Sequence, residues 1–221
     1  MPRKETVIGL DLGHSNIKAV WATRKGRGIE IQRTELLRLS AEGSQEGVIQ
    51  PWLERLGISR LPCVLALPGS KTMFQPFELP PADPRSYEQA ASMEVVRFNE
   101  MASEEMAYDY QQIDIGEDER RFLLTMTRQT VLDELLETAR GMRLNIVDVV
   151  PTPVALFNAA ADVVDTDSGV TVYADIGHAG TNVAVGLRRN LLFARAFAVG
   201  GRLFTETLAR NRNISAAQAG N

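Results

Sequence analysis

The chain has 221 residues, of which 44% are hydrophobic and 24% are charged, and its formal net charge at pH 7 is -4. These values are ordinary for a globular protein of one large or two modest domains. A negative chain has no surplus of cations to neutralise phosphates, so the composition argues against a general nucleic-acid binder. No apolar run of about 18 residues is present, so we expect no membrane-spanning helix and a cytoplasmic location.

The first part of the chain, up to residue 69, has the pattern of a strand meander followed by a helix and another strand. Short apolar runs separated by glycine-containing turns indicate the strands, and apolar residues at helical spacing indicate the helix. The single cysteine, Cys63, lies in the last strand, so we interpret it as a small buried hydrophobe rather than a reactive thiol. The expected elements are strands over residues 6–12, 17–23 and 29–37, a helix over 45–56 and a strand over 61–67.

The middle of the chain, residues 70–147, has a different order of strand and helix patterns from the first part and predicts a small α+β unit. An amphipathic helix separates an extended segment from a hairpin, and a second amphipathic helix and a strand follow the hairpin. We interpret this unit as an inserted subdomain. The expected elements are a strand over 72–79, a helix over 84–101, strands over 107–115 and 121–127 joined by a turn at 116–119, a helix over 130–142 and a strand over 144–150.

The last part of the chain repeats the opening pattern after a helix over 154–164 and a polar linker at 165–169. Strands separated by short turns again precede a helix. The repeat stops unfinished at Asn221, so we expect the second lobe to be incomplete in this chain. The expected elements are strands over 170–176, 182–187 and 191–198, a helix over 202–210 and the beginning of another helix from 214.

The most informative feature is a duplicated turn, in which an aspartate at the end of an apolar strand is followed, after one aliphatic residue, by a glycine. Asp11 and Gly13 form the first copy, Asp175 and Gly177 form the second, and the chain's two histidines follow these glycines. A carboxylate at the end of a buried strand is costly unless a metal or a metal-bound water pairs with it. Glycine lets backbone N–H groups approach a phosphate.

Two such turns facing each other across a cleft can hold a polyphosphate, with Mg²⁺ bridged by Asp11 and Asp175. The alternative is that each motif is an ordinary hairpin, because Asp and Gly are common turn residues. Two copies in the same strand context favour the phosphate site. The chain has no Walker-type loop, and the two histidines and one cysteine are too far apart in sequence to favour a zinc site or a nucleophilic triad.

The segment from Ile8 to Val20 resembles the first phosphate motif of the actin-like ATPase superfamily, in the form found in its FtsA/PilM branch. The segment from Asp175 to Thr181 resembles the second phosphate motif. Other segments resemble those of the type IV pilus assembly family PilM in the same order, so that the resemblance covers the whole chain. These segments are 65–69, the acidic helix after Pro84, 108–111, 147–149 and 197–201.

The resemblance implies an α/β protein with an actin-like (ribonuclease H-like) fold and an inserted small α+β subdomain. The adenosine-binding glycine motif of the superfamily would lie beyond residue 221. The implied division assigns residues 1–69 to the first part of subdomain 1A, 70–147 to the inserted subdomain 1C, 148–168 to the return to 1A and a linker, and 169–221 to the start of subdomain 2A.

The resemblance also implies ATP and Mg²⁺ as ligands, and we assign no catalytic residue in this sequence. Asp11 and Asp175 would face Mg²⁺ and its waters, and Lys18 would lie near the phosphates, although a solvated edge-strand lysine is an equal alternative. Thr152 stands where the family commonly has a glutamate, and the two histidines replace small residues, so we expect slow hydrolysis at most. The remaining residues that would cradle the phosphates are Gly13, His14, Ser15 and Asn16 in the first turn, and Gly177, His178, Gly180 and Thr181 in the second.

A PilM-like chain would be a cytoplasmic scaffold of a type IV pilus or related secretion platform, peripheral to the inner membrane through a partner. Its inserted subdomain would help to bind the cytoplasmic tail of a PilN-like membrane protein as an extended segment. The alternatives are an FtsA-like division filament with a C-terminal amphipathic membrane helix, a degenerate interaction module without nucleotide, and a sugar or acetate kinase with a substrate pocket. Self-association through exposed strand faces and edges is a further expectation.

Overall fold

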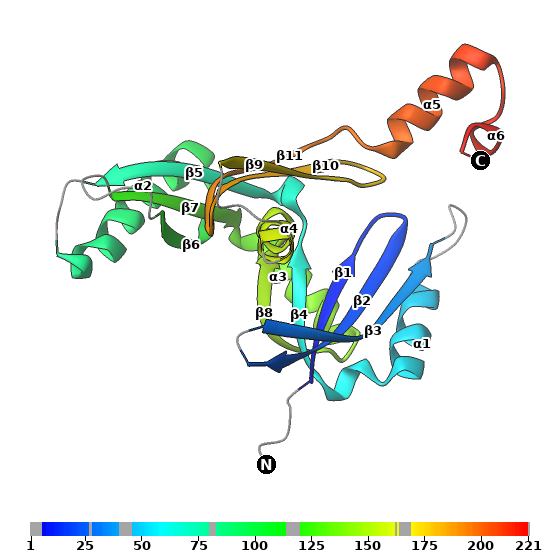
Figure 1. Cartoon of the computed structure of the whole chain (residues 1–221), viewed down its shortest axis with the longest axis horizontal. Helices are drawn as coiled ribbons and strands as arrows, with labels where there is room; N and C mark the ends of the chain where they lie inside the picture. Colours follow the sequence, from blue (N-terminus) through cyan, green and yellow to red (C-terminus); the bar gives the residue numbers. More distant parts are fainter. Residues whose placement is uncertain are drawn as a thin grey trace. The chain divides into compact units, whose positions relative to one another are not determined.

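The computed structural model describes residues 6–26, 28–39, 46–79, 83–113, 120–161, 163 and 169–220. The chain divides into two compact units, a first unit of Met1–Pro68 and Thr130–Pro151 and a second unit of Gly69–Gln129 and Thr152–Asn221. Figure 1 labels the helices and strands of both units. In the described ranges, no helix is both long and apolar enough to cross a membrane. The predicted turn at 116–119 and most of the predicted linker, residues 165–168, lie outside the described residues.

The first unit is built on a five-stranded sheet in the order β3-β2-β1-β4-β8. Strands β1, β2 and β3 form an antiparallel meander, whereas β4 runs parallel to both β1 and β8. A register shift at Trp21 and Ala22 marks a bulge in the long hairpin of β2 and β3. The strands are β1 (Thr6–Leu12), β2 (Asn16–Lys25), β3 (Gly28–Arg38), β4 (Pro62–Leu67) and β8 (Asn145–Pro151).

Two helices supply most of the rest of the first unit's core. Burial alternates along β1, so Ile8 and Leu10 point into the core, where they meet Trp52 of α1 and Ala139 of α3. Cys63 is fully buried in the same core, which confirms its interpretation as a small apolar residue. The helices are α1 (Glu46–Leu56) and α3 (Gln129–Gly141).

The second unit contains two three-stranded antiparallel sheets, in the orders β5-β7-β6 and β11-β10-β9. Both sheets contribute to one hydrophobic core, in which Leu123 of β7 clusters with Leu191 of β11 and with Phe157 of helix α4 (Thr152–Ala161). The middle of the chain and its last part therefore form one body. The strands are β5 (Thr72–Leu79), β6 (Met106–Ile113), β7 (Arg120–Arg128), β9 (Val170–Ile176), β10 (Thr181–Leu187) and β11 (Asn190–Phe197).

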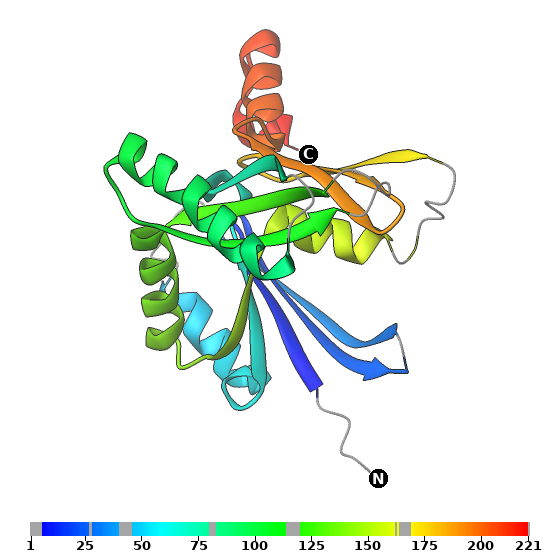
Figure 2. The same ribbon diagram turned by 90° about the vertical axis from the view of Figure 1, so that its left-hand side faces the viewer.

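Helix α2 (Tyr87–Ala102) covers one face of the β5-β7-β6 sheet (Figure 2). Ala91 and Val95 lie one helical turn apart and pack against Leu124 and Met126 of β7. The small and β-branched side chains let the helix approach the sheet closely. This packing fixes α2 against the sheet.

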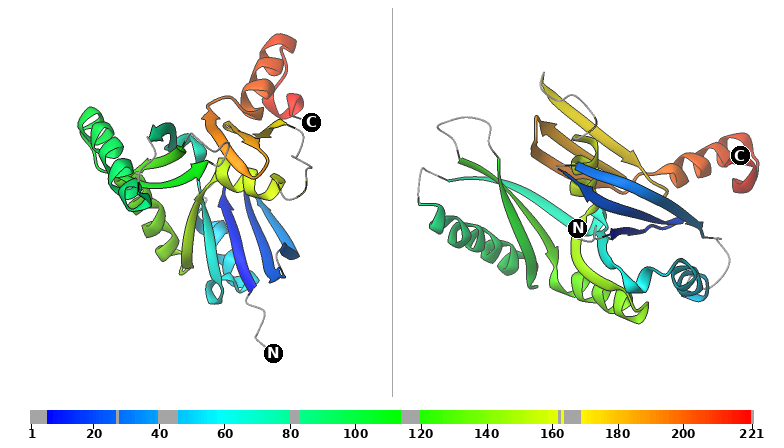
Figure 3. Two further views of the ribbon diagram at one scale, coloured as in Figure 1. Left: turned by 60° about the vertical axis from the view of Figure 1, so that its left-hand side comes forward. Right: turned by 60° about the horizontal axis from the view of Figure 1, so that its bottom comes forward.

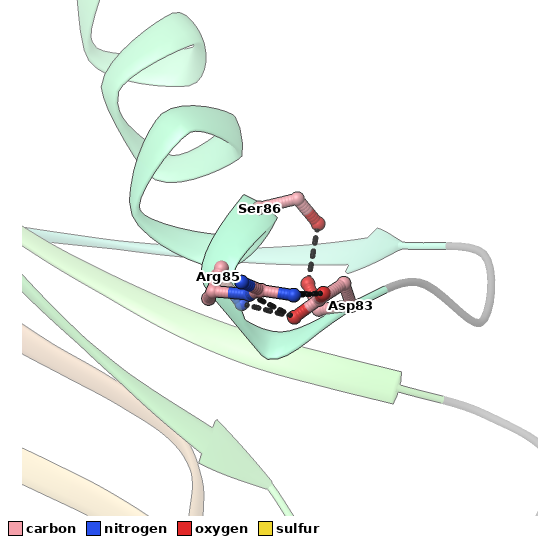
Figure 4. A network of polar contacts seen from close by, with 3 residues as sticks. All are labelled: Asp83, Arg85 and Ser86. Carbon is pink, nitrogen blue, oxygen red and sulfur yellow. Dashed lines mark hydrogen bonds and ion pairs between the residues drawn. The ribbon is translucent and has the colours of Figure 1, made fainter.

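The chain enters α2 through a short turn that Asp83 organises (Figure 4). The Asp83 carboxylate accepts hydrogen bonds from the backbone and the guanidinium of Arg85, and its carbonyl accepts one from the Ser86 hydroxyl at 2.7 Å. The hydrogen bonds from Arg85 lower the pKa of the Asp83 carboxyl from its ordinary value. The first helical turn, Pro84–Ser86, is a 3-10 turn, and the predicted helix follows it.

Helix α4 (Thr152–Ala161) packs on the β11-β10-β9 sheet, where the Phe157 ring meets the Tyr173 ring edge-on at 5.9 Å. Beyond β11 the chain continues into α5 (Gly201–Arg212), which leads away from these strands and buries none of its residues (Figure 3). The short helix α6 (Ala216–Ala219) begins at a capping box formed by Ser215 and Gln218.

The helices and strands expected from the sequence are present, with boundaries that differ by a few residues at most. The structure also assigns α3 and β8 to the first unit, although the sequence analysis placed them mainly within segment 70–147. Strand β8 pairs with β4, and Ala139 of α3 lies in the first core. By packing, Gly69–Gln129 is the part of this segment that belongs to the second unit. Periodicity identifies a helix or a strand, but it does not reveal which sheet the element joins.

Candidate functional site

Two β-hairpins carry the candidate residues, one in each unit, and their strands pair in the same way. Asp11 of β1 lies opposite Lys18 of β2, and Asp175 of β9 lies opposite Asn182 of β10. Each partner follows its aspartate by seven residues. The duplication in the sequence is therefore matched by equal register in the two hairpins.

The turn of the first hairpin requires glycine at position 13. A Cβ on Gly13 would lie 2.7 Å from the carbonyl oxygen of Asn16, which is closer than real Cβ contacts. The Asn16 side-chain amide donates to the Ser15 hydroxyl at 3.0 Å, and the Ser15 carbonyl accepts from the backbone N–H of Leu39 at 2.8 Å. His14 is exposed in this turn. The backbone of the turn is thus fixed, while the histidine ring faces solvent.

The carboxylate of the first hairpin already has a cationic partner. Lys18 Nζ donates to Asp11 Oδ2 at 3.1 Å, and the two side chains are 52% and 35% exposed. At this exposure, solvent screens the pair, which contributes only about 0.2–1 kcal/mol to stability. Lys18 is thus paired with Asp11 while half of its side chain stays exposed, and its strand β2 lies between β1 and β3 rather than at the edge of the sheet. The position of Lys18 near phosphates stays a prediction.

The second hairpin turns at Gly177, whose backbone N–H donates to the carbonyl of Gly180 at 2.8 Å. A Cβ on Gly177 would lie 3.0 Å from that oxygen, which repeats the close approach in the first hairpin. A Cβ on Gly200 would lie 2.6 Å from backbone atoms of Gly177, His178 and Gly180. The first two N–H groups of α5 donate to the carbonyls of Gly177 and His178 at 2.8 and 2.9 Å. The beginning of α5 therefore rests directly on this turn, which uses two of its otherwise free N–H groups.

The side chains of the second hairpin make different contacts from those of the first. Asn182 Nδ2 donates to Asp175 Oδ2 at 3.3 Å, so an uncharged amide stands where the first hairpin has an ammonium group. The Thr181 hydroxyl donates to the carbonyl of Val199 at 2.6 Å. His178 is exposed, like its counterpart in the first turn.

The structure gathers the predicted residues into two turns, each within its own unit. A single magnesium ion bridged by Asp11 and Asp175 stays a prediction, as does the cradling role of every residue in the turns. Over the described residues, no group of three or more His, Cys, Asp and Glu side chains is arranged to hold a metal. The gathered residues are Asp11, Gly13, His14, Ser15, Asn16 and Lys18 in one turn, and Asp175, Gly177, His178, Gly180 and Thr181 in the other.

Two residues that contact the second hairpin and its turn, Asn182 and Gly200, were not predicted from the sequence as part of the site. Asn182 could have been found by aligning the two copies, because it stands at the position that Lys18 occupies in the first. Gly200 was noticed as part of a resembling segment, but its contact with the turn is visible only in the folded chain.

A five-stranded mixed sheet and two equivalent aspartate hairpins are the features of an actin-like ATPase fold, and this chain has that fold. The solved structure of a PilM–PilN type IV pilus biogenesis complex is similar over 99% of this chain and 69% of its own chain. The TM-score is 0.74 and the sequence identity is 23%. The resemblance to the PilM family in the sequence is thereby confirmed for the fold.

Two more distant structures share the fold. The cytoplasmic domain of EpsL, an inner membrane component of the type II secretion system of Vibrio cholerae, has a TM-score of 0.55 at 12% identity, over 93% of this chain and 75% of its own. A Bacteroides thetaiotaomicron protein with an actin-like ATPase fold has a TM-score of 0.50 at 9% identity, over 96% and 79% of the two chains. The sequence matches no protein-family model and no curated protein.

Proposed function

We propose that this chain is part of a nucleotide-binding scaffold at the assembly platform of a type IV pilus or a related secretion system. The observation that carries the proposal is the similarity, over 99% of the chain, to a structure of the PilM–PilN biogenesis complex. The likeness to a component of a type II secretion system supports the same kind of platform. The scaffold would be cytoplasmic and held at the inner membrane through a partner.

The nucleotide would be ATP with Mg²⁺. Its phosphates would lie against the two turns. Each turn supplies a carboxylate, and the glycines at positions 13 and 177 allow its backbone to fold tightly on itself. Asp11 and Asp175 would face Mg²⁺ and its waters, and Lys18 would lie near the phosphates. This donor set fits a hard cation bound mostly through water and phosphate oxygens.

The partner would be the cytoplasmic tail of a PilN-like membrane protein. An extended tail can add a strand to a free sheet edge. Strand β6 is suited to this, because within the described residues β7 is the only strand that pairs with it. Towards the end of β6, the Gln111 amide donates to the carbonyl of Leu191 on β11 at 3.5 Å, so the tail would pair with the earlier part of the strand. Its side chains Tyr108 and Asp109 lie at the surface and can contribute to specificity.

Calorimetry with ATP and Mg²⁺ tests the nucleotide site. The wild-type chain should bind, and the double variant Asp11→Ala with Asp175→Ala should not. Asp148→Ala is a matched control, because this exposed aspartate lies on β8 outside both turns. Equal binding by the wild type and the double variant would show that the phosphate assignment of the two turns is wrong.

A second candidate is an actin-like interaction module that has lost nucleotide binding. The neutralised Asp11 favours it, because Lys18 occupies the carboxylate that would face the cation. Here the wild type would bind no ATP, yet would still bind a fluorescent peptide of the partner's tail in an anisotropy titration. A scrambled peptide is the control. An ATP turnover assay with candidate sugars distinguishes the scaffold and the interaction module from a sugar kinase. The scaffold should hydrolyse ATP very slowly or not at all.

A further inference from the structure

The two hairpins share their geometry but differ in the group that holds each carboxylate. In the first, the ammonium of Lys18 contacts Asp11 at 3.1 Å, and in the second, the amide of Asn182 contacts Asp175 at 3.3 Å. An ammonium cancels the charge of a carboxylate, whereas an amide donates a hydrogen bond and leaves the charge in place. Among the described residues, no cationic side chain pairs with Asp175.

The amide of Asn182 is confined on the side away from Asp175. A Cβ on Gly69 would collide with Asn182 Oδ1 and would lie 3.0 Å from side-chain atoms of Pro153. The oxygen of the amide is therefore packed against the chain at Gly69, and its nitrogen is directed to the carboxylate. The reverse orientation would place Oδ1 against Asp175 Oδ2, where two acceptors repel each other.

We infer that Asp175 interacts more strongly with the divalent cation than Asp11 does, because Asp11 shares its charge with Lys18, and that Asn182 is the positioning residue that orients Asp175. This inference rests on the proposed nucleotide function and assigns unequal roles to two aspartates that the sequence presents as equivalent. A cation that approached Asp11 would meet the positive charge of Lys18 at the same carboxylate, and like charges at this separation repel.

A neutral hydrogen-bond donor can orient a carboxylate that binds a cation without cancelling the carboxylate's charge. A hydrogen bond to one oxygen fixes the orientation of the group, and the remaining lone pairs accept from metal-bound waters. Replacing Asn182 by lysine would copy the first hairpin into the second. The new ammonium would compete with the cation for Asp175.

The inference is tested with Mn²⁺ as the probe, by electron paramagnetic resonance of free Mn²⁺ over the full chain saturated with ATP. Asn182→Ala should weaken Mn²⁺ binding on the order of 10-fold, as expected for loss of an outer-shell partner. Asn182→Lys should weaken it further. In both variants the affinity for ATP in EDTA should stay at the wild-type value or rise. Asn211→Ala, at an exposed asparagine of α5, is the matched control and should change neither quantity.

The outcomes separate this inference from the proposed function. Wild-type Mn²⁺ affinity in both Asn182 variants would overturn the inference, while ATP binding by the wild type would leave the function standing. Loss of ATP binding in EDTA along with Mn²⁺ binding would also overturn it, since Asn182 would then support the hairpin as a whole. A wild-type chain that binds neither ATP nor Mn²⁺ would end both. Thermal unfolding of each variant checks that the fold is retained.

Discussion

The hydroxyl of Thr181 donates a hydrogen bond to the backbone carbonyl of Val199 at 2.6 Å, and this contact joins the second hairpin to the segment that leads into α5. The resemblance of the second turn to a phosphate motif predicts that Thr181 faces phosphates. Because its one donor is directed at Val199, only the lone pairs of the hydroxyl remain, and these cannot donate to a phosphate oxygen. The contact therefore points to a structural role for Thr181 in holding the turn against the beginning of α5.

Thr181→Val keeps the shape of the side chain and removes this hydrogen bond. We expect it to lower the free energy of unfolding by about 1 kcal/mol and to speed hydrogen exchange of the first amides of α5. Urea denaturation and exchange mass spectrometry measure the two effects. Thr181→Ser retains the hydroxyl and should behave like the wild type. Equal behaviour of the valine and serine variants would show that the bond contributes nothing.

Gly200→Ala should be strongly destabilising, because its Cβ would meet three backbone atoms at 2.6 Å and none of them belongs to a flexible side chain. Overpacking of this kind typically costs about 1–3 kcal/mol, and backbone neighbours place this site at the upper end. Gly201→Ala is the matched control, since its nearest neighbour would be at 3.7 Å. Chemical denaturation of the two variants compares them. Similar losses at both positions would contradict the close packing of α5 on the turn.

Lys18→Met tests whether the lysine serves stability or ligand binding. The Lys18–Asp11 pair is exposed to solvent, so its loss should change the free energy of unfolding by less than about 1 kcal/mol. If Lys18 contacts the phosphates, affinity for ATP with Mg²⁺ should fall on the order of tenfold or more. Denaturation and calorimetry on the same preparation give both values. A large loss of stability with unchanged affinity would reverse this interpretation.

Burial raises the pKa of the Cys63 thiol from 9.0 to about 11. Unfolding releases a thiol that ionises at the lower value, so the stability that the neutral buried thiol provides is complete below pH 9 and is lost as the pH rises towards 11. We expect Cys63→Ala to flatten the fall in stability over this range, measured by denaturation at a series of pH values. The native chain should also resist a thiol reagent at pH 8 and react rapidly in denaturant. Rapid reaction of the native chain would contradict the burial of this residue.

Local sequence pattern was sufficient for the elements and for the two turns. Apolar alternation ending at an aspartate, followed by a glycine, predicted both strand ends at Asp11 and Asp175, because these features act over a few neighbouring residues. The same pattern does not predict the role of Asn182, because this role depends on Asp175, the residue opposite it in the sheet. Nor does this pattern predict the role of Gly200, because the residues that a Cβ at this position would meet, Gly177 to Gly180, lie far from it in the sequence.

By itself, the sequence determined which segments are helices and strands, where the duplicated turns lie, and a resemblance to a known fold that the structure confirmed. Side-chain periodicity and the conformational freedom of glycine are properties of short segments, so both can be recognised in the sequence before the fold is known. Only the tertiary structure decided that β8 completes the first sheet and that α3 packs in its core. It also decided that the inserted strands share a core with the last three strands, and that one aspartate pairs with an ammonium group while the other pairs with an amide. These outcomes depend on which apolar faces pack together and which side chains lie opposite each other in a sheet. Both depend on contacts between residues that are far apart in the sequence, so local pattern does not predict them.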